Sequence, residues 1–177
     1  MKYIFENSLK KKRIDQKLEK ELKKFWKKKR ISCTDPRDYL AFFKSLPNCT
    51  FFSNIGDEVS YIPSLPNCEV FINNVNKSLT TLPPLPKCRL FSCRKSSLTK
   101  LPRLPHAKYI ECSNNKITTI GKLSKCEKLD CHSNPITKME ENKKLKQIYC
   151  SETLLKTLTV PKNCYVDSTK KIKVKRI

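Results

Sequence analysis

A unit of about 19 residues recurs along most of this sequence and limits the chain to a repeat architecture. Cys93, for example, returns as Cys112, 19 residues later. With Cys88 as the first position of a unit, equivalent positions follow at spacings of 19 or 20: Cys49, Cys68, Cys88, Ala107, Cys126, Leu145 and Cys164. A unit of this length buries its apolar side only against its neighbours, so seven units predict a solenoid.

Three further positions of the unit, four, six and nine, hold similar residue types from one unit to the next. Position six is Asn54 and Asn73 in the first two units and Cys in the next four. Position four is always large and apolar: Phe52, Phe71, Phe91, Ile110, Leu129 and Ile148. These two positions alternate as in a short strand with one side inward. Position nine holds Asp57, Asn76, Ser96, Asn115, Asn134 and Thr153, so Asn is its commonest residue. The side-chain amide of Asn can form hydrogen bonds with the backbone of buried turns.

The unit, written LPxLPxCxxFxCxxNxLTxLP, resembles the leucine-rich repeat, with Cys in place of Leu at two core positions. It is similar to the short repeats of secreted bacterial effectors, and more similar to the cysteine-rich leucine-rich-repeat proteins of large DNA viruses. The resemblance covers residues 46–167, about seven units. It implies short parallel strands on a concave face, a helical cap at the N-terminal end, and a structural or assembly role in a virion.

The convex side of each unit is predicted to be extended rather than helical. Nineteen residues are too few for a strand, a full helix and two turns. The paired prolines of segments 83–86 and 102–105 exclude a helix there and favour polyproline II. Thin outer segments match a strand spacing of about 4.8 Å better than helices of about 10 Å diameter. We therefore expect a gently curved solenoid.

Residues 1–32 are predicted to form a basic amphipathic helix or arm. The first 30 residues hold 13 Lys and Arg against 4 acidic residues. The apolar residues fall on one helical stripe: Ile14, Leu18, Leu22 and Phe25 or Trp26. Docking on the first repeat is the interpretation that we favour; nucleic acid and an anionic membrane stay open. An anionic partner would meet Lys10, Lys11, Lys12, Arg13, Lys27, Lys28, Lys29 and Arg30.

Both ends of the solenoid need a cover, because an end exposes a strand edge and an open core. Residues 33–45 are predicted to be a capping helix, with Asp35 as N-cap, Pro36 at the first turn and an apolar face around Phe43. Residues 168–177 alternate Lys with Ile172 and Val174, which favours either a charge-protected edge strand or a basic tail.

Nine of the ten cysteines occupy positions one and six of the unit, all except Cys33. Ala107 and Leu145 replace Cys at position one, so these cysteines are expected to be small buried hydrophobes. Side chains on neighbouring parallel strands point the same way, which disfavours disulfides. The first residues contain Lys10 and no apolar signal core, so we expect reduced thiols and an intracellular location. If the protein is viral, as the resemblance implies, its location would be the virion.

No catalytic, cofactor-binding or metal-ligating residues are predicted, and the chain is expected not to be an enzyme. With only 2 glycines, a Gly-rich phosphate loop is excluded. His132 follows Cys131, and adjacent strand residues face opposite sides, so they cannot form a nucleophile pair. No two cysteines have the close spacing of a zinc knuckle.

The concave face offers the clearest candidate site. Its outward positions are apolar in the first half of the repeats and polar in the second. Apolar residues exposed together on successive strands mark an interaction surface. The predicted protein-binding residues are Phe51, Ile55, Val70, Ile72, Leu90 and Tyr109. The alternative is that the N-terminal helices fold back over them.

The net charge of +22 favours an anionic partner, which can be acidic protein, nucleic acid or an acidic membrane. We predict a non-enzymatic protein-interaction scaffold, and the resemblance implies a structural, minor-capsid-like component of a large DNA virus particle that binds coat proteins. Two other classes stay open: an intracellular adaptor or effector that binds host proteins, and a basic accessory protein that binds nucleic acid.

Overall fold

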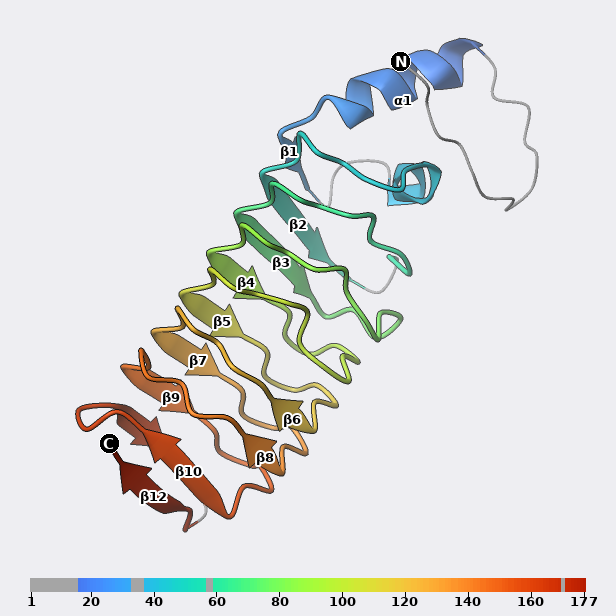
Figure 1. Cartoon of the computed structure of the whole chain (residues 1–177). Coiled ribbons are helices and arrows are strands. Elements are labelled where there is room, and N and C mark those ends of the chain that lie inside the picture. Colours follow the sequence, from blue (N-terminus) through green and yellow to red (C-terminus); the bar gives the residue numbers. More distant parts are fainter. Residues whose placement is uncertain (1–15, 33–36, 57–58, 170) are drawn as a thin grey trace.

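The described part of the computed structural model, residues 16–32, 37–56, 59–169 and 171–177, is an elongated parallel β-solenoid of about seven turns (Figure 1). One α-helix, α1 (Gln16–Trp26), precedes the turns. The stack is nearly straight, so its main sheet has no deep concave side (Figure 1). We call the solvent-facing surface of that sheet the strand face. The predicted repeat solenoid is confirmed.

Eight parallel strands, stacked along the solenoid, form the main sheet. They are β1 (Arg30–Ile31), β2 (Phe51–Ile55), β3 (Val70–Asn74), β4 (Leu90–Ser92), β5 (Tyr109–Glu111), β7 (Lys128–Asp130), β9 (Gln147–Tyr149) and β11 (Tyr165–Asp167). From β2 to β9 the register pairs equivalent positions of the unit, as Phe52 with Phe71. The sequence alignment of the units is therefore the structural alignment. Strand β1 was not expected, because it lies in the segment predicted to be a helix or arm.

Position four of the unit forms the centre of the core. The ring centroids of Phe52 and Phe71 lie 5.2 Å apart, and those of Phe71 and Phe91 lie 5.6 Å apart, with nearly parallel planes. These distances follow from a strand spacing of about 4.8 Å, which places equivalent rings face to face. Ile110 and Leu129 continue the column in the next units and are fully buried.

A buried Asn at position nine closes the turn after each of several strands. The amide nitrogen of Asn115 donates to the carbonyl of Cys93, in the preceding unit, at 2.7 Å. Its side-chain oxygen accepts from the backbone N–H of Leu98, also in the preceding unit, at 2.9 Å. Asn134 makes the equivalent bonds one unit later. Each such amide thus satisfies backbone groups that the strands leave unpaired inside the molecule.

The residue before position nine adopts the left-handed backbone conformation in the second to sixth units. Its φ is positive at Val75, Lys95, Asn114, Ser133 and Glu152. Gly56 also has positive φ at the equivalent position of the first unit. Only Gly and Asn adopt this conformation at low cost. A β-branched residue such as Val75, with φ at 59°, is therefore strained.

The outer side of the solenoid is extended, and it forms strands where prolines are missing. Segments 82–86 and 101–105, which contain two or three prolines each, form no strand. Proline has no N–H to donate to a neighbouring strand. The outer strands form two parallel pairs: β6 (Thr119–Ile120) with β8 (Lys138–Met139), and β10 (Thr157–Val160) with β12 (Lys173–Arg176).

The segment before the first repeat also differs from its prediction. A 3-10 helix spans Arg37–Phe42, where a longer capping helix over 33–45 was expected; residues 33–36 lie outside the described residues. The ring of Phe25, in α1, is buried and stacks on Phe43 at 5.8 Å. The apolar stripe of α1 therefore packs on the segment that leads into the first repeat. Ile14, the first residue of the predicted stripe, lies outside the described residues.

The C-terminal segment forms an edge strand rather than an unpaired tail. Strand β12 pairs in parallel with β10 through four residues. One guanidinium nitrogen of Arg176 donates to the carbonyls of Lys162, at 3.0 Å, and Cys164, at 2.8 Å. These bonds tie the last strand to the last turn of the solenoid. Of the two alternatives for residues 168–177, the strand is the one that forms.

Replacing Val75 by Asn should stabilise the protein. Asn tolerates left-handed φ, and Val75 is 42% exposed, so no core contact is lost. The expected gain is about 1 kcal/mol, or about 3 °C in the melting temperature. The reciprocal change, Asn114→Val, should lower the melting temperature, and circular dichroism measures both. Equal melting temperatures would show that the backbone there carries no strain.

Replacing Asn134 by Ala should destabilise the protein by about 2–4 kcal/mol, because buried backbone groups in two units lose their partner. Urea unfolding measures the change. Asn163→Ala is the matched control, because Asn163 is exposed, and its effect should stay within about 0.5 kcal/mol. A similar loss in both variants would mean that the amide of Asn134 has no special part in closing the turn.

Candidate functional site

The six predicted protein-binding residues lie together on the strand face, on neighbouring strands β2 to β5. The register places four of them in one straight row across the strands: Phe51, Val70, Leu90 and Tyr109. Leu90 is 37% exposed and Tyr109 is 49% exposed. Ile72 and Ile55 extend the apolar area along β3 and β2, and Ile55 is 56% exposed. We call these six residues the apolar row.

The described helices leave the apolar row open, which speaks against the alternative that they fold back over it. The apolar row contacts the N-terminal part of the chain through Arg30, on β1. Its guanidinium carbon lies 3.9 Å from the centre of the Phe51 ring, a cation–π contact. Phe51 is half-buried beneath it, whereas Leu90 and Tyr109 face solvent. Arg30 was predicted to belong to an anionic-partner site, and the structure places it on the strand face.

The strand face becomes polar on β4 and β5, beside Leu90 and Tyr109. The Nε of Arg94 lies 3.6 Å from a carboxylate oxygen of Glu111. The hydroxyl of Ser92 donates to that same oxygen at 3.1 Å, and Ser92 is buried although its position was expected to face outward. The Nζ of Lys128 lies 5.4 Å from the ring centre of Tyr149. The face therefore changes along the solenoid from apolar to polar.

Counted over the described residues, the strand face has a formal charge of zero. It carries three cations (Arg30, Arg94 and Lys128) and three carboxylates (Glu111, Asp130 and Asp167), with His132 counted as neutral. The chain as a whole carries +22. The net positive charge of the described residues therefore lies outside this face.

A His–Asp pair on the strand face was not recognised in the sequence. Nδ1 of His132 lies 2.6 Å from a carboxylate oxygen of Asp130, and Nε2 lies 3.3 Å from the side-chain amide of Asn114. The two residues are separated by one position, so on a strand they face the same side. That periodicity was the available signal. Both ring nitrogens have a polar partner, and Cys131 between the two residues is buried.

Half of the predicted anionic-partner residues, Lys10 to Arg13, lie outside the described residues. Lys27, Lys28 and Lys29 are exposed and follow α1 directly. The carbonyl of Lys29 accepts a hydrogen bond from the backbone N–H of Thr50 at 2.8 Å, so the first repeat holds this segment in place. These lysines lie close to the apolar row but form no part of it.

The nine described cysteines are buried free thiols, as expected. Burial raises the pKa of Cys88 and Cys126 to about 12 and that of Cys150 to about 11. Burial also raises the pKa of Cys93 and Cys112. A thiol attacks as its thiolate, so these groups are held in their unreactive form at neutral pH.

The described residues contain no cluster of three or more His, Cys, Asp or Glu side chains placed to hold a metal ion. Within the same part of the chain, no helix is long and apolar enough to span a membrane. Comparison with family models, with curated proteins and with solved structures gives no match. The assignment of a function therefore rests on the geometry of the chain and on the sequence pattern of its repeat.

Stability should fall at alkaline pH because of the buried thiols. An exposed thiol in the unfolded chain ionises near pH 9, whereas Cys88 and Cys126 stay protonated to about pH 12 when folded. The raised folded pKa means that their contribution is complete below pH 9 and is lost as pH rises towards 12. Each thiol lowers the free energy of unfolding by about 1.4 kcal/mol per pH unit in that window.

Urea unfolding between pH 7 and pH 11 measures this dependence. Replacing Cys88 and Cys126 by Ala, the residue that stands at the equivalent position 107, should remove the part of the pH dependence of the unfolding free energy that these two thiols contribute. Leu145→Ala is the matched control, because Leu145 occupies the same position of the unit without a thiol. If both variants keep the slope of the parent chain, deprotonation of the lysines rather than of the thiols is its cause.

Proposed function

We propose that this chain is a non-enzymatic scaffold that binds a protein partner through the apolar row. One observation carries the proposal: four apolar side chains stand in register on four neighbouring strands and face solvent wholly or in part. A continuous apolar area on a soluble protein is unfavourable unless a partner covers it. Aromatic residues such as Tyr109 and Phe51 supply much of the binding energy in protein interfaces.

The charge distribution favours protein over nucleic acid as the occupant of the strand face. Nucleic acid is held by cations that neutralise phosphates. The strand face has a formal charge of zero, and Arg94, one of its cations, is already paired with Glu111. Nucleic acid remains the second candidate partner, for the exposed lysines Lys27 to Lys29 rather than for this face.

We assign the solenoid to the leucine-rich-repeat type. The pattern LPxLPxCxxFxCxxNxLTxLP supports this type, because its inward positions four, six and nine are the buried ones. We also assign α1 and the 3-10 helix Arg37–Phe42 as the N-terminal cap. The edge-to-face contact of Phe25 with Tyr39, at 5.6 Å, and its stacking on Phe43 support that role.

A structural or assembly role in the particle of a large DNA virus follows from the resemblance of the repeat to viral proteins. In that role the solenoid would bind coat proteins inside or at the edge of a shell. The alternative is an intracellular adaptor or effector that uses the same surface on host proteins. An intracellular, reducing location suits both roles, since the nine described cysteines are free thiols.

Replacing Val70, Ile72 and Leu90 by Ser should weaken partner binding about a hundredfold or more, because it removes the centre of the apolar row. The fold should persist, since none of the three is a core residue. The matched control replaces by Ser three residues near the C-terminal end of the same face: Gln147, Tyr149 and Tyr165. Binding of that variant should change less than about threefold.

The partner is first identified by cross-linking mass spectrometry in the native material, with a photoreactive residue at position 90. Links at fixed stoichiometry to a repeating coat component would support the virion role, and links to one soluble protein would support the adaptor role. Links to nucleic acid alone, or scattered over many proteins, would contradict the proposal. So would an equal loss of binding in the two triple variants.

A further inference from the structure

The outer side of the solenoid carries a second apolar surface, built from prolines. In segment 82–86, Leu82 and Leu85 point inward, and Leu85 is fully buried. Polyproline geometry has three residues per turn, so Pro83 and Pro86 share one outward ridge. The next unit repeats this arrangement in segment 101–105. Stacking aligns these prolines into two rows along the axis: Pro63, which is buried, with the partly exposed Pro83 and Pro102, and Pro47, Pro66, Pro86 and Pro105.

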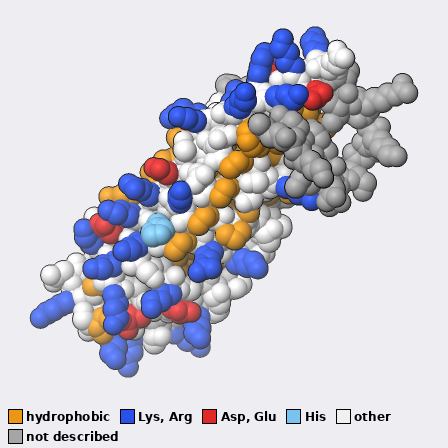
Figure 2. Space-filling model, turned by 45° about the horizontal axis from the view of Figure 1, so that its top comes forward, with side chains coloured by type: hydrophobic (Ala, Val, Ile, Leu, Met, Phe, Trp, Pro, Cys, Tyr) orange, Lys and Arg blue, Asp and Glu red, His pale blue; other side chains and the backbone are white. Residues whose placement is uncertain are grey.

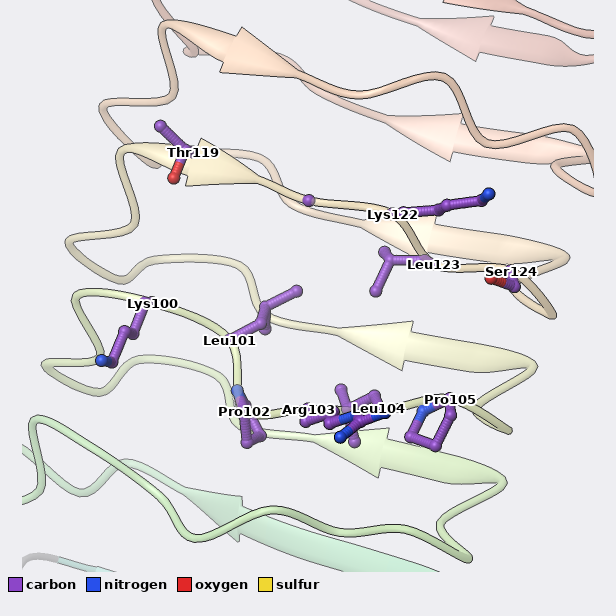
Figure 3. Close-up of a pocket in the computed structure, with 11 residues that line it drawn as sticks. Lys100, Leu101, Pro102, Arg103, Leu104, Pro105, Thr119, Lys122, Leu123 and Ser124 are labelled. Atoms are coloured by element: carbon purple, nitrogen blue, oxygen red, sulfur yellow. The ribbon is translucent and has the colours of Figure 1, made fainter.

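Figure 2 shows hydrophobic side chains in a stripe along this side of the molecule, with Lys and Arg on its flanks. Both proline rows end at the same place. Gly121 stands where Pro102 stands one unit earlier, and Ser124 stands where Pro105 stands. A hollow of about 410 Å³ lies there, between segments 101–105 and 119–124 (Figure 3).

The lining of the hollow has a definite chemistry. Its apolar part comes from Leu101, Pro102 and Pro105, which are partly exposed. Three cations line it, Lys100, Arg103 and Lys122, and none of the lining residues is acidic. One carboxylate lies beside the lining: the Oε1 of Glu140 lies 3.9 Å from the position that a Gly121 side chain would take. The hollow is thus apolar at its wall and positive at its rim.

We propose that this hollow is a second binding site, which takes an acidic peptide segment with an aromatic side chain. The volume lies within the usual range of ligand sites, about 300–1,000 Å³, and accepts one aromatic ring with its neighbouring residues. The ring packs on the prolines and under the guanidinium of Arg103. Carboxylates beside the ring meet Lys100 and Lys122.

The position of this site adds to the proposed function without depending on it. The hollow lies on the outer side, whereas the apolar row lies on the main sheet, so the two surfaces face away from each other (Figure 1). A partner on the strand face leaves the hollow open. The chain can therefore hold two different proteins at once and bridge them.

The two glycines of the chain provide a direct test by nuclear magnetic resonance. Their amide signals resolve from those of other residues; Gly121 lines the hollow, and Gly56 lies in a turn after β2. The probe is the acetylated and amidated peptide Glu-Glu-Trp-Glu-Glu at an ionic strength of about 0.15 M. The Gly121 signal should shift and saturate, whereas the Gly56 signal should stay in place.

Three variants separate the proposed contacts from general attraction to a basic protein. Arg103→Glu with Lys122→Glu should weaken binding at least about tenfold. The matched control, Lys156→Glu with Lys175→Glu, makes the same charge change at exposed residues outside the lining, and should weaken binding less than about twofold. Glu140→Gln should tighten binding, because it removes the carboxylate beside Gly121.

Two control ligands test the chemistry of the ligand. The peptide Glu-Glu-Ala-Glu-Glu, which lacks the ring, should bind at least about tenfold more weakly. Inorganic phosphate should leave the Gly121 signal in place. The proposal is overturned if the Gly121 signal does not saturate, if both charge-reversal pairs weaken binding equally, or if the ring-free peptide or phosphate acts as strongly as the probe.

Discussion

The buried amide at position nine is the interaction on which the rest of the solenoid depends. Asn115 and Asn134 each bond backbone groups in two consecutive units, so they set how one turn lies on the next. Thr153 shows the effect of a shorter side chain: its hydroxyl donates to Cys150 of its own unit, at 2.8 Å. Once neighbouring turns are aligned, equivalent side chains must stack at the strand spacing. In the core, this stacking produces the column of Phe52, Phe71 and Phe91. On the surface, it produces the apolar row of the strand face and the proline rows of the outer side.

The core and the candidate site were predictable from the sequence to the extent that they follow the period. The register of Phe52 on Phe71 and the shared surface of Val70 and Leu90 depend only on counting residues from one unit to the next. The two-residue strand β1 has no equivalent in the 19-residue pattern, so the period could not reveal it. The positive φ of Val75 is also invisible in the sequence, because the stacked turns force a conformation that this residue type avoids.

Features that depend on a break in the period were the hardest to predict. The hollow lies where Gly121 and Ser124 take the places of the prolines of the preceding unit, and its volume depends on which neighbouring side chains fill the space. The strands on the outer side have the same origin. Thr119 and Ile120 pair with the next unit where the proline pairs have ended, since backbone N–H groups become available there. A unit without these prolines thus differs from the preceding unit in both the hydrogen bonding and the surface of the outer side.

In-register stacking also constrains the charge of this protein. Equivalent positions lie about 4.8 Å apart, so a row of identical charges would repel along the whole stack. The structure places a carboxylate between cations in one such row: Glu127 lies 3.7 Å from the Nζ of Lys108 and 2.7 Å from that of Lys146. The hydrogen bond from Lys146 lowers the pKa of Glu127, which keeps that carboxylate ionised. Such exposed pairs contribute little stability by themselves, but they relieve repulsion where lysines recur at the repeat spacing. On the strand face the charges balance completely, and this is the face on which an apolar row can stay accessible to a protein partner.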